Sequence, residues 1–190
     1  MPTLFNLFMK KKLLILLVGI AITVVSSAQI TKATLQASGL TCAMCARAVY
    51  QNLESLPFIE KVDTDLNASS FLLIFKTGMN VDLDALSKKV QDAGFSVASL
   101  VVTMKVDAIQ IENDKHFLLN NIAFHFVNIK SQKINGEFSF RLVDNGFVSA
   151  KEFKKYSGMT KLPCIKSGKA EACCISAGIK EGSRIYHSTI

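Results

Sequence analysis

Gly39-Leu40-Thr41-Cys42-Ala43-Met44-Cys45-Ala46 separates two segments whose apolar residues repeat with different periods. Over residues 33–38, before it, alanine and leucine alternate with polar residues, which predicts a strand with one buried face. Over residues 45–56, apolar residues recur at helical spacing, and Pro57 follows where a helix should have ended. The two cysteines are therefore expected where a loop leads from a strand into a helix.

The residue types in this stretch indicate a site for a soft metal ion. Thiolates of Cys42 and Cys45 suit Cu(I), zinc, cadmium and mercury, and two intervening residues allow both sulfurs to face one ion. Cys45 falls in the first helical turn, where free N–H groups and the helix dipole favour thiolate over thiol. Gly39 permits the backbone conformation that a loop around an ion commonly requires. The alternative role for the two cysteines is a disulfide.

The pattern continues in the order of a known sandwich. Residues 62–66 and 71–76 have the character of strands, 83–93 carries a second helical stripe that ends at Gly94, and 95–102 is again strand-like. The order β-α-β-β-α-β predicts a ferredoxin-like sandwich, with both helices on one face of a four-stranded antiparallel sheet. Because the strand at 71–76 is apolar on both faces, we expect the C-terminal half to cover its second face.

Residues 33–102 resemble the heavy-metal-associated domain family, which includes copper chaperones, cytosolic tails of metal-transporting ATPases and small periplasmic mercury-scavenging proteins. The resemblance rests on the loop and on the end of the second helix, at Gly39, Thr41, Cys42, Cys45 and Asp92-Ala93-Gly94-Phe95. It implies that Cys42 and Cys45 bind the metal. Leu40 stands where the family commonly has Met, a change that keeps volume and apolarity. Phe95 matches an aromatic position near the family's site, although core packing is the simpler role for it.

The ligand set favours a monovalent ion. With two thiolates and no carboxylate beside them, a near-linear site for Cu(I) or Hg(II) is more natural than tetrahedral zinc. We expect Cu(I), with Hg(II), Zn(II) and Cd(II) as the alternatives. Met44 is expected to point away or pack, not to act as a thioether ligand.

Residues 103–190 are predicted to form a small β-rich domain with one helix, and they resemble no family that we recognise. The expected elements are an extended segment over 101–111, strands over 122–126, 138–142 and 184–190, and a helix over 150–156. Asn135-Gly136 is a strong hairpin signal between two of these strands. Ser149 and Glu152 have the spacing of a capping box for the helix. The fold expected for the whole chain is therefore α+β, with a division between residues 102 and 103.

Cys164, Cys173 and Cys174 form a second cysteine cluster after this helix. Because the chain has five cysteines, at least one thiol is not paired within it. One interpretation is a disulfide from Cys164 to Cys173 or Cys174. The others are a second soft-metal site of two or three thiolates, or a spare thiol that relays metal to or from the first site.

The histidines and Met159 are weaker candidates for metal ligands than the cysteines. His187, His125 or Met159 could complete the second soft-metal site. A lone strand histidine such as His187 is more often structural, and His116 has no visible partner. Neither of these two is expected to be a ligand.

Residues 1–28 are predicted to be a secretory signal. Lys10 to Lys12 precede the apolar run 13–25, and Ser26-Ser27-Ala28 follows it as a cleavage site. We expect a soluble mature chain in the periplasm or outside the cell, beginning near Gln29; an uncleaved anchor facing outside is the alternative. Removing three lysines and no acids lowers the net charge from +7 to +4 (7 − 3). Without a basic cluster interleaved with aromatics, nucleic-acid binding is not expected.

The expected function is that of an exported metal carrier, scavenger or chaperone, not of an enzyme. Its partners would be the metal ion and either a membrane metal transporter or another cysteine-bearing carrier. One alternative is a thiol-disulfide oxidoreductase, although the chain has no Trp and no Gly-Pro between its cysteines. Another is a metal-sensing accessory module that docks a membrane partner.

Overall fold

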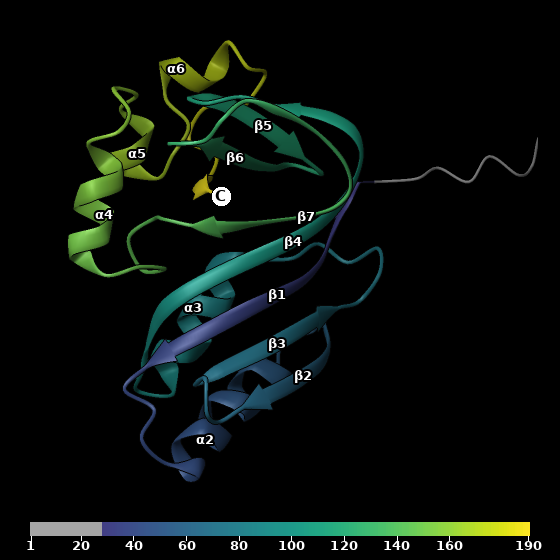
Figure 1. The fold of residues 1–190 in the computed structure, drawn as a ribbon, viewed down its shortest axis with the longest axis vertical. Coiled ribbons are helices and arrows are strands. Elements are labelled where there is room, and N and C mark those ends of the chain that lie inside the picture. The colour runs from purple at the N-terminus through teal and green to yellow at the C-terminus, as the bar shows by residue number, and fades with distance from the viewer. Residues whose placement is uncertain (1–27) are drawn as a thin grey trace, which may run out of the picture.

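The structure, a computed structural model, describes residues 28–190 (Figure 1). Apart from Ala28, the predicted secretory signal lies outside the described residues. Within 28–190, no helix combines the length and the apolar character needed to cross a bilayer.

Residues 28–190 form one eight-stranded sheet and five helices. The strands are β1 (Gln29–Ser38), β2 (Ile59–Asp65), β3 (Ser70–Phe75), β4 (Ser96–Ile111), β5 (Lys115–Leu119), β6 (Ile122–Phe126), β7 (Gln132–Leu142) and β8 (Ile185–Thr189). The helices are α2 (Ala43–Glu54), α3 (Leu83–Asp92), α4 (Ala150–Ser157), α5 (Cys164–Ser167) and α6 (Ala172–Ile175). The strand order in the sheet is β2-β3-β1-β4-β7-β8-β6-β5.

The first half confirms the predicted ferredoxin-like sandwich. β2, β3, β1 and β4 are neighbours in antiparallel pairs, and α2 and α3 cover one face of them (Figure 1). Each helix begins at a side-chain cap, since Sγ of Cys42 accepts the N–H of Cys45 and the Asp82 carboxylate accepts the N–H of Ala85. The apolar stripes that face the sheet are Ala46, Val49 and Leu53 on α2, and Leu83, Leu86 and Val90 on α3. Burial of each large side chain contributes about 1.5–3 kcal/mol, which holds the helices in place.

The sheet continues across the division that we predicted between residues 102 and 103. β4 is a single strand of 16 residues that pairs with β1 on one side and with β7 on the other. One buried apolar cluster includes Leu35 and Leu86 from the first half, and Phe124 and Phe140 from the second. The two halves therefore share a sheet and a core.

We expected the C-terminal half to cover the second face of β3, and this expectation is wrong. That half extends the sheet from the edge of β4, and Leu72 on the second face of β3 remains 37% exposed. The physical reason is that an edge strand offers unpaired N–H and C=O groups, which β7 satisfies along most of the length of β4.

The predicted turn at Asn135-Gly136 is also wrong. Both residues lie inside β7, where Gly136 has φ +91° and faces Val106. The register of β4 shifts just beyond Val106, next to Ala108 with φ +48°, so the glycine lies at a bulge. β6 and β7 form no hairpin because β8 lies between them, parallel to β6 and antiparallel to β7.

The last helices are partly as predicted. α4 begins at Ser149, whose hydroxyl accepts the N–H of Glu152 at 3.2 Å, and its C-cap is Gly158. α5 and α6 are single turns that the sequence pattern did not reveal. They lie in the segment 158–184, which packs on the far side of β6 and β8 from the shared core.

Candidate metal-binding sites

Cys42 and Cys45 lie where the sequence predicts them, at the start of α2. Cys42 is the N-cap residue with extended backbone, and its Sγ accepts the N–H of Cys45 at 3.2 Å. Cys42 is exposed and Cys45 is half-buried, so both thiols can be reached from solvent. Each is a free thiol in the structure.

The neighbours of the pair fix the loop and leave the sulfurs accessible. Gly39 has φ +81°, a region that favours glycine, and a Cβ at this position would lie 4.0 Å from the Phe95 ring. Phe95 therefore packs beside the loop, while Leu40 is partly buried and packs against the core. Met44 is 73% exposed, in agreement with the expectation that it points away.

The two thiols are electrostatically unequal. Cys42 accepts one hydrogen bond from the side chain of Cys45 and another from its backbone N–H, and both lower the pKa of Cys42. The same side-chain hydrogen bond, followed by desolvation, raises the pKa of Cys45. Cys42 therefore ionises first, and a metal ion has to displace the proton of Cys45.

The surroundings of the pair contain little carboxylate. The first turn of α2 has no acidic residue. Asp65 lines a small cavity of about 160 Å³ together with Cys42, but its Oδ1 accepts the N–H groups of Asn67 and Ala68. That carboxylate is thus engaged in holding the β2–β3 turn.

The three C-terminal cysteines come together in the fold. The sulfurs of Cys164, Cys173 and Cys174 all lie within 4.8 Å of one another, and those of Cys173 and Cys174 are 3.4 Å apart. Cys164 and Cys174 are buried and Cys173 is half-buried. All three are free thiols in the structure.

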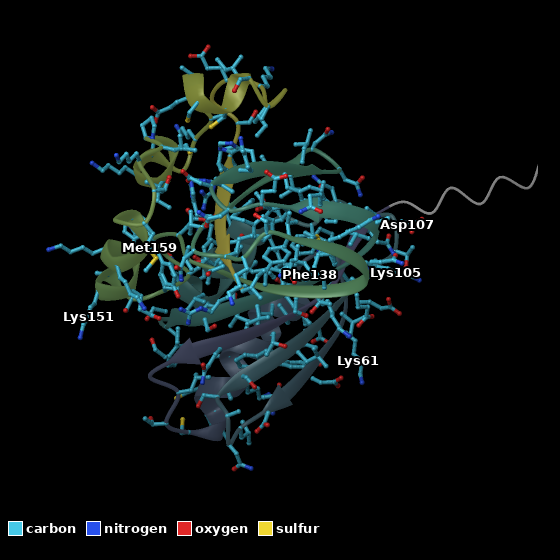
Figure 2. All side chains as sticks on the ribbon, turned by 45° about the horizontal axis from the view of Figure 1, so that its top comes forward. Lys61, Lys105, Asp107, Phe138, Lys151 and Met159 are labelled. Atoms are coloured by element: carbon cyan, nitrogen blue, oxygen red, sulfur yellow. The ribbon has the colours of Figure 1, made fainter. Side chains whose placement is uncertain are left out.

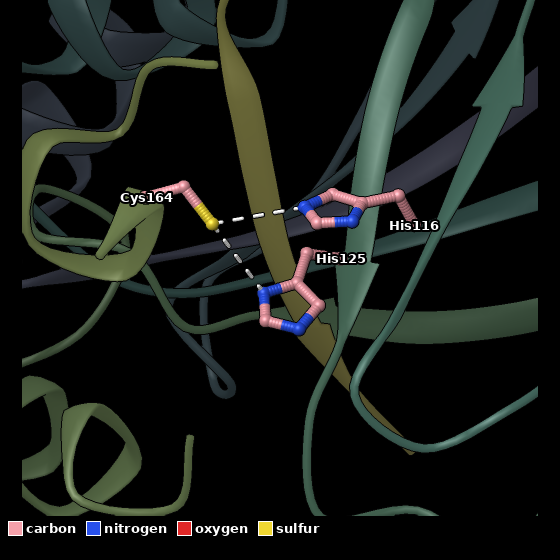
Figure 3. Close-up of side chains that lie close together, drawn as sticks. All are labelled: His116, His125 and Cys164. Carbon is pink, nitrogen blue, oxygen red and sulfur yellow. Dashed lines mark hydrogen bonds between the residues drawn. The ribbon is translucent and has the colours of Figure 1, made fainter. Parts of the chain in front are cut away.

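Two histidines join this cluster (Figure 3). His125 is one of the residues that the sequence offered for completing a second soft-metal site, whereas His116 was not expected to be a ligand. Nε2 of His116 lies 3.7 Å from the Cys164 sulfur and 3.3 Å from that of Cys174. Nδ1 of His125 lies 4.0 Å from the Cys164 sulfur. His116 and His125 are direct cross-strand neighbours in the β5–β6 hairpin, with ring centroids 4.7 Å apart. The missed signal was the turn Asn120-Asn121, where both residues have positive φ as a type I′ turn requires.

The environment of His125 keeps its ring neutral. Its Nε2 lies 2.9 Å from a carboxylate oxygen of Asp114, which also accepts the hydroxyl of Thr160. Burial, then the nearby His187 and His116, lower the pKa of His125 to about 4 despite this carboxylate. Burial also lowers the pKa of His116 and raises that of the Cys164 thiol.

His187 and Met159 lie outside the cluster. His187 pairs with His125 across β8 and β6, but its Nδ1 is held 2.6 Å from the Asp144 carboxylate. Its buried Nε2 has no hydrogen-bond partner within the described part of the chain. Met159 is 37% exposed beside α4 (Figure 2).

The two cysteine sites lie at opposite ends of the molecule. In Figure 1, α2 is at the bottom of the longest axis, whereas α5 and α6 are at the top. The structure therefore does not bring Cys164, Cys173 or Cys174 to Cys42, as a relay within one molecule would require.

Comparison with known proteins identifies the first half. Residues 34–96 match the family model of the heavy-metal-associated domain. No curated protein sequence matches the chain.

A solved structure of the yeast copper transporter domain Ccc2a is 22% identical, covering 35% of this chain and 90% of that one, with a TM-score of 0.32. The N-terminal domain of ZntA is 23% identical, covering 36% of this chain and 90% of that one, with a TM-score of 0.32. A copper-binding domain from HMA7, a P-type ATPase, is 24% identical over 36% of this chain and 90% of that one, with a TM-score of 0.33. Residues 34–96 of this chain are therefore a heavy-metal-associated domain.

Proposed function

We propose that the protein is an exported metal carrier or scavenger that binds Cu(I) through Cys42 and Cys45, and that it is not an enzyme. The observation that carries the proposal is the position of the two thiols within the heavy-metal-associated domain. Both are free and accessible at the start of α2, and Cys42 accepts the N–H of Cys45. Export rests on the signal-like sequence of residues 1–28 alone.

The donor set supports Cu(I) over a divalent ion. Two thiolates satisfy a monovalent soft ion in a near-linear arrangement, whereas zinc prefers four ligands. The first turn of α2 supplies no carboxylate, and Asp65 is occupied by backbone N–H groups. Hg(II) fits the same two thiolates and is the principal alternative, with Zn(II) and Cd(II) less suited.

The exposure of Cys42 supports transfer by ligand exchange. An incoming thiolate from a partner can approach the ion from the solvent side, form a third bond and then replace one of the two cysteines. The partner chemistry is therefore a cysteine-bearing site on a membrane metal transporter or on another carrier.

A redox role is the second candidate, because the pKa of Cys42 is lowered while that of Cys45 is raised. Such an asymmetric C-x-x-C pair is what a thiol-disulfide oxidoreductase uses. Reduction of insulin disulfides by the protein would favour this role, and its loss in Cys42→Ser would assign it to this pair.

The test is a Cu(I) titration of the reduced protein against a competing chelator. We expect the wild type to hold one equivalent more than the double variant Cys42→Ser/Cys45→Ser. The matched control is Met44→Leu, which changes the exposed residue between the cysteines and should retain that equivalent. If the double variant holds as much tightly bound Cu(I) as the wild type, the proposed site is wrong.

A further inference from the structure

We propose that the C-terminal half holds a Zn²⁺ ion in a buried tetrahedral site, independent of Cys42 and Cys45. The ligands are two imidazole nitrogens and two thiolates, from His116, His125, Cys164 and Cys174. Figure 3 shows the first three of these residues, and the Cys174 sulfur lies 3.3 Å from Nε2 of His116.

Three distances between sulfur and nitrogen atoms of these residues are close to those that such an ion would impose. With Zn–S of about 2.3 Å and Zn–N of about 2.05 Å, tetrahedral angles place a sulfur and a nitrogen roughly 3.6 Å apart. Nε2 of His116 lies 3.3 Å from the Cys174 sulfur and 3.7 Å from the Cys164 sulfur, and Nδ1 of His125 lies 4.0 Å from the Cys164 sulfur. Nε2 of His116 has either one proton or one lone pair, so it can make only one well-aligned hydrogen bond to the two sulfurs that it faces. A metal ion between the nitrogen and the two sulfurs can contact all three atoms.

A neighbouring carboxylate orients one of the ligands. Asp114 accepts only, so the His125 nitrogen that faces it at 2.9 Å carries the proton. Nδ1 of His125 is then the nitrogen with a free lone pair, and it is the one that faces Cys164. Thr160 donates to the same oxygen of Asp114 and fixes it in turn. This carboxylate–histidine arrangement is the usual support of a metal-bound imidazole.

The charge of the site favours two thiolates over three. Two thiolates and two neutral rings around Zn²⁺ sum to zero, which a buried site tolerates, whereas a third thiolate would leave an uncompensated negative charge. The sulfurs of Cys164 and Cys174 are the two that lie near His116, and both residues are fully buried. Cys173 is half-buried and has its sulfur 3.4 Å from that of Cys174, so it lies beside the proposed ligands without being counted among them.

The fold gives the ion a structural task. The segment 158–184 contains only the single turns α5 and α6, and a covering segment with so little regular structure is uncommon. It packs on the sheet through a small buried cluster in which two members are proposed ligands: Ala123, Cys164, Ala170, Cys174, Ile179 and Ile185. An ion bound to β5, β6, α5 and α6 would fasten this segment to the sheet, as metals do where an apolar core is small.

The experiment uses the reduced full chain carrying Cys42→Ser/Cys45→Ser, so its result does not depend on the Cu(I) site. The probe is Co²⁺, followed by displacement with Zn²⁺. We expect one equivalent of Co²⁺ to bind with intense tetrahedral d–d absorption and a thiolate-to-cobalt charge-transfer band, and Zn²⁺ to remove both. Absence of Co²⁺ binding, or the weak spectrum of an octahedral oxygen site, would overturn the proposal.

Variants then assign the ligands. In the same background, Cys174→Ser should weaken Co²⁺ binding by more than about 100-fold, beyond the range known for outer-shell residues. The matched control Cys173→Ser changes the adjacent thiol and should leave affinity and spectrum as they were; an equal loss in both variants would contradict the ligand set.

A third variant tests the ligand set without removing a proposed ligand, so that a loss of metal binding cannot be explained by loss of folding. Asp114 is at the surface and has φ +59°, a conformation that Asn also adopts, so Asp114→Asn should fold. It should lower Co²⁺ affinity about 10- to 100-fold with an unchanged spectrum, because it only positions His125. Unchanged affinity in Asp114→Asn would refute the assignment of His125.

Discussion

Asp144 is a buried carboxylate that holds the central strand of the C-terminal half. Its oxygens accept the backbone N–H of His187 at 2.8 Å and the ring Nδ1 of His187 at 2.6 Å, and Arg184 lies 3.7 Å away. Asp144→Ala would leave both donors of His187 buried without an acceptor. Each such donor costs about 1–3 kcal/mol, so the free energy of unfolding should fall by roughly 4 kcal/mol. For a chain of this size that corresponds to a fall in Tm of about 8–16 °C.

The assay is urea and thermal unfolding of the reduced protein, with Asp84→Ala as the matched control. Asp84 binds the same Arg184 through two hydrogen bonds, but the pair is half-exposed. An exposed pair contributes up to about 1 kcal/mol, so the control should lose far less than Asp144→Ala. If the two variants lose equal stability, the inference that unsatisfied buried donors set the cost is wrong.

Two further predictions concern the shared core and the metal-binding loop. Phe140 is buried in the cluster that joins both halves, so Phe140→Ala should cost about 3–5 kcal/mol and lower the hydrogen-exchange protection of both halves together. Separate unfolding of residues 29–102 and 103–190 in urea would contradict the shared core. Gly39 has φ +81°, so Gly39→Ala should destabilise the protein by about 1–2 kcal/mol, measured by thermal unfolding. An unchanged Tm would show that the loop relaxes without strain.

The first half could be predicted because its signals are local. Period-two and helical patterns succeed one another over short segments, and Gly39 and Pro57 mark the ends of elements directly. The position of Cys42 at the start of α2 follows from the same patterns. No long-range information was required to place the two thiols side by side.

The prediction for the second half was wrong at the turns between its strands. Asn135-Gly136 and Asn120-Asn121 are both turn signals, and only the second closes a hairpin. The difference comes from β8, which enters between β6 and β7 from the end of the chain. Such an insertion leaves no trace in the residues of β6 or β7 themselves.

To predict the histidine–cysteine cluster, one would need both the local turn signal and the long-range packing of the C-terminal segment. His116 and His125 lie equally far from the Asn120-Asn121 turn, so a correctly placed hairpin would have paired them. Their approach to Cys164, which is 48 residues from His116 and 39 from His125 along the chain, depends on how the segment 158–184 folds over the sheet. No periodic pattern specifies that contact, because single-turn helices have none.

The exposure of the two proposed sites separates their roles. Transfer by ligand exchange needs an incoming thiolate to reach the ion, and Cys42 at the exposed start of α2 allows this. His125, Cys164 and Cys174 are fully buried and His116 is half-buried, so an ion held among them would be much less accessible to an incoming ligand than one at Cys42. The same chain therefore combines a site suited to exchange with a site suited to retention. Because β4 carries both halves in one sheet, an ion that fastens the covering segment also stabilises the sheet to which the exchanging site is attached.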